Sequence, residues 1–194
     1  MTSEQLLLNK IKLGNRNAFR EFVEHYKSNV YSVAFRLTGN HADADDLSQV
    51  VFIKFFNSIN RYRQETGLQS WLYKIAVNSY IDKERKKVNR IIHRFEQPEE
   101  NENSFEENII SEKADPEQLT ESGMIKKHIE IALEKLSPKE RSAFVLKHYQ
   151  GQTLGEIAKA INTTEGTVKS LLFRGVKKLQ SALAFYKPDL GLGG

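Results

Sequence analysis

Residues 137–183 read SPKERSAFVLKHYQGQTLGEIAKAINTTEGTVKSLLFRGVKKLQSAL and contain two capping boxes. In each box a hydroxyl side chain stands three residues before a glutamate, Ser137 before Glu140 and Thr153 before Glu156, and the pair can satisfy free amides at a helix start. A glycine between the boxes can end the first helix, and an Asn-Thr-Thr run after the second box breaks the next one. The segment therefore predicts a lead-in helix, a short helix and a longer helix, the order of a helix-turn-helix.

The longest of these predicted helices has an apolar back and a cationic front. At about 100° per residue its apolar residues fall on one side, and no acidic residue occurs between Gly166 and Lys187. The front carries cations, a hydroxyl and one aromatic ring: Lys169, Ser170, Phe173, Arg174 and Lys177. In a major groove such cations meet phosphates and Arg174 can bond to guanine, so we expect DNA binding. The alternative, a solvated amphipathic helix of a bundle, is disfavoured by the short capped helix and tight turn in front of it.

The composition of the whole chain limits its class. The 194 residues suffice for one ordinary domain or two small ones, and the net charge of +4 suits a polyanionic partner. Without cysteine there is neither a disulfide nor a thiolate metal site, which fits a reducing compartment. The N-terminus lacks the pattern of a signal peptide, and no apolar run is long enough to span a bilayer. No carboxylate pair, metal cluster, nucleophile triad or phosphate loop stands out. We therefore expect a soluble cytoplasmic protein that is not an enzyme, with no catalytic residue, no cofactor, no metal and no direct membrane insertion.

The N-terminal half predicts a helical bundle with one unusual face. Apolar residues recur at helical spacing from residue 4 to residue 37, and a further helix is expected from near Asp43 to about Ile59. The core stripe of that helix holds Leu47, Val50, Val51 and Phe55. Another face holds Asp46, Gln49 and Ile53, with Phe52 and Phe56 close by. An acid, an amide and an apolar group on one face favour docking to a protein, because carboxylates repel phosphate. For Asp43 and Asp45 the alternative is that they only stabilise the positive N-terminus of the helix.

A loop and a basic helix follow. Residues 61–69 are expected to form the loop, and Ser70 can cap the helix after it. One side of this helix is expected to pack, and the opposite side carries Lys74, Asn78, Ile81 and Arg85 before a basic run over residues 83–90. Aromatic and arginine side chains beside a cationic helix suit single-stranded DNA, because bases stack on rings and cations follow the backbone. The alternative is an ordinary solvated helix end.

Residues 96–121 have the composition of a linker. They contain ten acidic residues and one lysine, with Pro98 and Pro116 as helix breakers. Their apolar content is too small to offset the entropy lost on ordering. The chain is therefore expected to consist of two basic helical modules joined by an acidic linker.

Three stretches, in this order, resemble the extracytoplasmic-function group of bacterial RNA polymerase sigma factors, in the sigma-70 family: DDLSQVVF at 45–52, SWLYKIAVN at 70–78, and LSPKER at 136–141 together with 153–160 and EGTVKS at 165–170. The first is similar to the helix that docks on polymerase, and the second to the helix that handles the −10 promoter element. The third is similar to the helix-turn-helix that reads the −35 element. The resemblance covers nearly everything from Phe19 to Leu183 except the linker.

The resemblance implies an all-α fold of two small helical domains joined by a flexible acidic linker. In this sequence the parts would be a region 2 bundle over residues 1–95, the linker over 96–122, a region 4 helix-turn-helix over 123–187 and a flexible tail over 188–194.

The resemblance also implies roles for single residues. Core polymerase would be bound through Asp46 and Gln49, with Leu47 and Phe52 supporting their helix. The −10 element would be bound by Arg61, Tyr62, Arg63, Lys74, Asn78, Arg85 and Lys86. The −35 element would be read by Thr167, Lys169, Ser170, Phe173, Arg174 and Lys177.

The implied function is to direct core polymerase to specific promoters and to open them, and the implied partners are core RNA polymerase, promoter DNA and an anti-sigma factor. Val50 stands where the family often has glutamate, which removes one possible polar contact with polymerase. Leu171 and Val176 stand where it often has arginine, so the −35 contact is expected to be weaker or differently specified. Two other functions remain open from the residues alone. One is a helix-turn-helix regulator that binds an operator without acting as a polymerase subunit, and the other is an adaptor whose basic faces bind acidic proteins or RNA.

Overall fold

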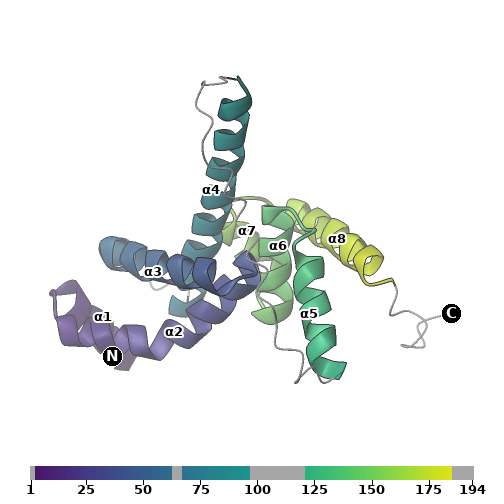
Figure 1. Ribbon diagram of the computed structural model, residues 1–194. Coiled ribbons are helices and arrows are strands. Elements are labelled where there is room, and N and C mark those ends of the chain that lie inside the picture. The colour runs from purple at the N-terminus through teal and green to yellow at the C-terminus, as the bar shows by residue number, and fades with distance from the viewer. Residues whose placement is uncertain (1–2, 63–66, 97–120, 185–194) are drawn as a thin grey trace.

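The computed structural model describes residues 3–62, 67–96 and 121–184, and within these ranges all regular structure is helical (Figure 1). The first group of helices comprises α1 (Ser3–Lys12), α2 (Arg16–Thr38), α3 (His41–Ser58), a 3-10 turn (Ile59–Arg61) and α4 (Leu68–Glu96). The second comprises α5 (Glu121–Leu133), α6 (Pro138–Phe144), a π-helical turn (Val145–Tyr149), α7 (Leu154–Ala160) and α8 (Glu165–Ala182). The predicted all-α fold of two small helical domains is confirmed. The predicted linker and tail lie almost wholly outside the described residues.

The first domain is a bundle of α2, α3 and α4, against which α1 packs through α2. Its centre is aromatic: the rings of Phe22 and Phe55 are fully buried and stack with their centroids 4.1 Å apart. Trp71 on α4 meets Phe55 edge-on at 5.2 Å and packs, partly buried, against this core. The long helix α2 ends at Gly39, whose φ of 85° is a left-handed conformation that glycine adopts without steric cost.

The second domain is built by the local signals quoted from the sequence. Both capping boxes are present, because Ser137 and Glu140 satisfy each other's backbone amides and Thr153 and Glu156 do the same. Thr164 caps α8, and its side chain accepts a hydrogen bond from the amide of Thr167. The predicted lead-in helix, short helix and longer helix are therefore confirmed as α6, α7 and α8.

Three local details differ from the prediction. The lead-in helix is not regular up to Gly151, since α6 ends at Phe144 and a π-helical turn continues the chain. The helix expected to be capped by Ser70 begins earlier, at Leu68. Val50, assigned to the core stripe of α3, is 38 % exposed, because the apolar face of α3 is wider than the surface that α2 and α4 cover.

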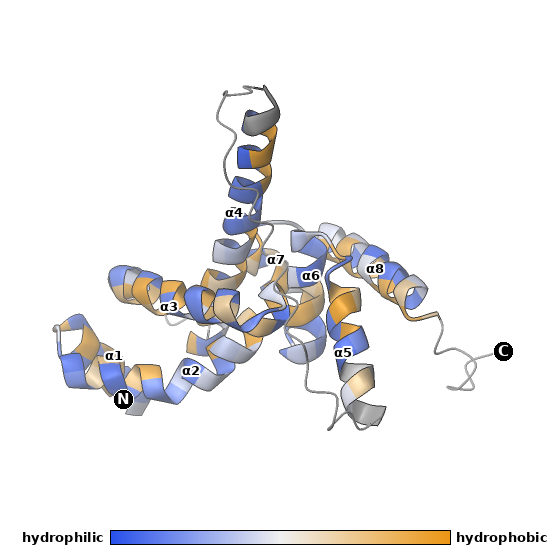
Figure 2. Ribbon diagram, in the orientation of Figure 1, coloured by the Kyte–Doolittle hydropathy of each residue, from blue (hydrophilic) through white to orange (hydrophobic). Residues whose placement is uncertain are grey.

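The two domains pack against each other. α4 contacts α6 and α7, and α2 contacts α6. Ile157 and Ile161 of the second domain belong to the same buried apolar cluster as Leu72 and Val77 of α4. In Figure 2 apolar segments, in orange, gather where α4, α6 and α7 meet, while the C-terminal half of α4 extends away from the other helices (Figure 1). The sequence predicts two helical modules joined by a linker, and no local pattern in it indicates this contact.

Candidate nucleic-acid and protein interfaces

The predicted docking face lies on α3. Asp46 and Gln49 are exposed, as docking to a partner requires. Leu47 is buried in the core and Phe52 is nearly so, which leaves both in supporting positions. Ile53, 59 % exposed, continues the face as an apolar surface, together with the exposed side chains of Val50 and Phe56.

Beside these residues, α2 and α3 form an open groove of about 470 Å³. Gln49 and Phe52 line it from α3, together with Asp45 and Ser48, and α2 contributes Lys27, Ser28 and Tyr31. The α2 side of the groove was missed in the sequence. It depends on which face of α2 lies beside α3, and no local pattern reports that.

The predicted −10 residues are spread along α4 and the turn before it. Arg61 is exposed in the 3-10 turn, and the ring of Tyr62 packs on Trp71 with centroids 4.8 Å apart. Arg85 and Lys86 are exposed on the extended half of α4, where Arg85 pairs with Asp82 at 3.2 Å. Arg63 lies outside the described residues.

Lys74 and Asn78 lie in the half of α4 that meets the second domain, and both are half-buried. The Asn78 side-chain nitrogen donates to the carbonyl oxygens of Lys74 and of Ala160 in α7, each at 2.9 Å. Both donors of the amide are therefore engaged, one of them by the helix-turn-helix. A nucleotide could take that donor only after α7 has moved away.

Two further polar side chains form hydrogen bonds between the two domains. Gln152 Nε2 donates to Ser70 Oγ at 3.1 Å. Arg141, only 5 % exposed, donates from Nε to the carbonyl of Arg36 at 2.8 Å, in the last turn of α2 where carbonyls lack a helical partner. The Arg36 guanidinium in turn lies 4.4 Å from the ring centroid of Tyr149.

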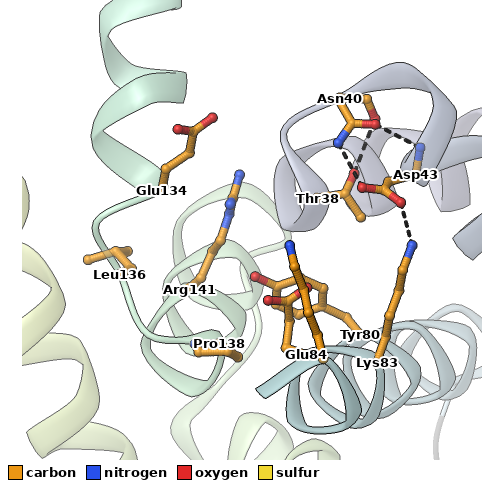
Figure 3. A pocket seen from close by; sticks show the side chains of 11 residues that line it. Thr38, Asn40, Asp43, Tyr80, Lys83, Glu84, Glu134, Leu136, Pro138 and Arg141 are labelled. Atoms are coloured by element: carbon orange, nitrogen blue, oxygen red, sulfur yellow. Dashed lines mark hydrogen bonds and ion pairs between the residues drawn. The ribbon is translucent and has the colours of Figure 1, made fainter. Parts of the chain in front are cut away.

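A polar cavity of about 290 Å³ lies between the domains, next to Arg141 (Figure 3). On its α3 side Asp43 is hydrogen-bonded to Asn40 and paired with Lys83 of α4. These contacts, first that of Asn40 and then that of Lys83, lower the pKa of Asp43. The Asn40 side chain also accepts from the Asp43 amide and so caps α3. These contacts support the alternative for Asp43, a structural role at the helix start.

Helix α8 has the two faces that its sequence predicts. Val168, Leu171, Gly175 and Leu179 are buried. The residues predicted to read DNA are all exposed along the other side: Thr167, Lys169, Ser170, Phe173, Arg174 and Lys177. Phe173 is 72 % exposed, which is unusual for an aromatic ring and leaves it free to contact a partner.

Beneath this face lies an acid that the sequence showed only as a helix cap. Glu140 is 4 % exposed, and its Oε1 lies 3.5 Å from Nε of Arg174. Its Oε2 accepts from Nζ of Lys178 at 2.7 Å. The two α8 cations are four residues apart, so one carboxylate can reach both.

Comparisons with known proteins show the family of each domain. The family model for Sigma-70 region 2 matches residues 22–90, and that for Sigma-70 region 4 matches residues 129–179. The chain is 30 % identical to the ECF RNA polymerase sigma factor SigW of Bacillus subtilis over 176 residues, which cover 91 % of this chain and 94 % of SigW. It is 34 % identical to the ECF RNA polymerase sigma factor SigE of Mycolicibacterium smegmatis over 169 residues, which cover 87 % of this chain but only 63 % of that longer relative.

Solved structures share the fold. The sigma factor RpoE of Bartonella quintana, in complex with the anti-sigma factor NepR, superposes with a TM-score of 0.63 at 22 % identity, covering 86 % of this chain and 96 % of that one. CnrH, in complex with the cytosolic domain of CnrY, superposes with a TM-score of 0.61 at 18 % identity, covering 94 % of this chain and 98 % of that one. Among the helices of the described residues, none combines the length and apolarity that a bilayer crossing needs.

Proposed function

The chain belongs to the extracytoplasmic-function group of RNA polymerase sigma factors, and from this we propose that α3 docks it on core polymerase while α4 and α8 engage two promoter elements. Residues 1–95 would form the docking and −10 unit, and residues 123–187 the −35 unit. The observation that carries the proposal is the exposed cationic face of α8, set on a helix-turn-helix and joined in one chain to a region 2 bundle.

In this function the protein is an initiation subunit and no enzyme, working in the cytoplasm where polymerase is. Promoter opening would draw on binding energy: unstacking and flipping a base costs a few kcal/mol, which base stacking and phosphate contacts can offset. Two modest DNA contacts on one chain also gain from effective concentration. As a further partner we propose an anti-sigma factor, since the similar RpoE of Bartonella quintana was solved with one.

Reconstituted transcription tests the proposal. Purified core polymerase and this chain should initiate at a subset of genomic promoters, and permanganate should detect unpaired thymines near the −10 element. Occupancy of a DNA site without melting would instead indicate a plain helix-turn-helix regulator. The region 2 match makes that alternative the less favoured one.

The docking face yields a first prediction. Asp46→Ala and Gln49→Ala should each weaken binding to core polymerase by about 1 kcal/mol, or about five-fold, because each removes a polar contact at an interface. Equilibrium binding to labelled core measures the change. Lys12→Ala, an exposed change on α1, is the matched control and should bind normally. Unchanged affinity in both α3 variants would remove these residues from the docking face.

The recognition helix yields a second prediction. Arg174→Ala should cost about 1–3 kcal/mol at one base pair of the −35 element, because a bidentate contact to guanine is lost. Lys177→Ala should instead weaken binding to all sequences and lower the slope of affinity against salt by about one. Binding of the holoenzyme to promoters with single base-pair changes separates the two. A loss for Arg174→Ala that is equal on every sequence would make Arg174 a phosphate contact.

A further inference from the structure

We propose that Glu140 is a positioning residue for promoter recognition: its buried carboxylate holds Arg174 by Nε and so presents the outer edge of the guanidinium to the −35 element. The inference rests on the proposed function of α8 and adds to it a residue on another helix, α6. The contact joins Glu140 Oε1 to Arg174 Nε at 3.5 Å.

The carboxylate is well placed to act as a fixed anchor. Its Oε2 accepts from the Ser137 amide at 3.0 Å and from Lys178 Nζ at 2.7 Å, so it is tied both to the start of α6 and to α8. Burial pushes the pKa of Glu140 upward, but the hydrogen bonds from Lys178 and Ser137 outweigh it and leave the pKa below its usual value. Glu140 is therefore negatively charged at neutral pH.

The atom that Glu140 engages decides what remains for DNA. A guanidinium has five N–H donors in one plane, and the Nε side is only one of its edges. With Nε turned toward Glu140, Nη1 and Nη2 remain for O6 and N7 of guanine, the bidentate pairing that specifies this base. Arg174 retains 59 % side-chain exposure, so this outer edge is accessible. An arginine held in advance also loses less side-chain entropy when it binds.

A buried anion below a cationic face has a second, opposite effect. It reduces the general attraction of α8 for phosphates, because like charges repel. Glu140 should therefore favour specific over non-specific binding through both effects, and its removal should change the two affinities in opposite directions. A purely structural residue would not have this signature.

The test compares Glu140→Gln with Glu156→Gln in the holoenzyme. Glutamine keeps an oxygen for the capping box but removes the charge. Glu156 occupies the same capping-box position on α7 and is paired with Thr153. Binding is measured on a promoter found by the transcription assay, on its single base-pair variants and on unrelated duplex DNA.

We expect Glu140→Gln to reduce the affinity ratio between the promoter and its variant at the base pair read by Arg174 by about five- to ten-fold. Its affinity for unrelated DNA should rise. Glu156→Gln should raise affinity for unrelated DNA without loss of discrimination. Arg174→Ala combined with Glu140→Gln should discriminate no worse than Arg174→Ala alone, because Glu140 acts through Arg174.

If Glu140→Gln does not fold, Glu140→Asp is used instead, because aspartate keeps the charge but its shorter side chain withdraws the carboxylate from Arg174. It should lose discrimination without a rise in non-specific affinity.

The outcomes separate this inference from the proposed function. Full discrimination in Glu140→Gln or Glu140→Asp, together with its loss in Arg174→Ala, overturns the role of Glu140 alone. Full discrimination in Arg174→Ala as well overturns the assignment of Arg174 on which it rests.

Discussion

A short cross-link between Ser70→Cys and Gln152→Cys is expected to abolish initiation from promoters. In the structure Gln152 Nε2 lies 3.1 Å from Ser70 Oγ, so a short bis-maleimide joining these positions would hold the helix-turn-helix against α4. In that position Ala160 of α7 occupies a donor of Asn78, which the −10 element would need. The natural chain contains no cysteine, so the reagent reacts only with the introduced pair.

Transcription by reconstituted holoenzyme measures the effect. The double variant without reagent should initiate normally, as should each single variant treated with it. A linker with a reducible bond should allow activity to return on reduction. Undiminished initiation by the cross-linked chain would show that α7 need not leave α4 when a promoter is bound.

Phe55→Ala is expected to lower the free energy of unfolding by about 3–5 kcal/mol. The Phe55 ring is completely buried, stacks on Phe22 at 4.1 Å and meets Trp71 at 5.2 Å, so the substitution removes packing from the centre of the first domain. Domains of this size are stable by only about 5–15 kcal/mol, which makes the loss a large fraction of the total.

Urea unfolding followed by circular dichroism and by tryptophan fluorescence measures this loss. Trp71 is the only tryptophan of the chain and reports on this core directly. Ile53→Ala, on the same helix but 59 % exposed, is the control and should change stability by less than about 0.5 kcal/mol. A loss below about 1 kcal/mol for Phe55→Ala would mean that the cavity is refilled by its neighbours.

The features predicted correctly from the sequence are those that depend on residues close together in the chain. Both capping boxes need residues only three positions apart, and the two faces of α8 follow from helical periodicity alone. Val50 shows the limit of periodicity: it marks the apolar side of α3, but only packing decides which part of that side is covered.

Other features depend on contacts between distant segments. The Asn78–Ala160 and Ser70–Gln152 hydrogen bonds each join residues 82 positions apart, and no local sequence pattern predicts them. The three-residue spacing of Ser137 and Glu140 predicts the helix cap. The contact of Glu140 with Lys178, 38 residues further along the chain, depends on the packing of α6 beside α8.

The apolar cluster that α7 shares with α4 bears on the fate of the free protein. Ile157 and Ile161 are buried in this cluster, so separating the two domains would expose apolar side chains to water. A chain whose two domains are separated, and which is not bound to polymerase, would be prone to aggregation and to proteolysis. The contact between α4 and α7 therefore shields the apolar side chains of both helices from water while the protein is free.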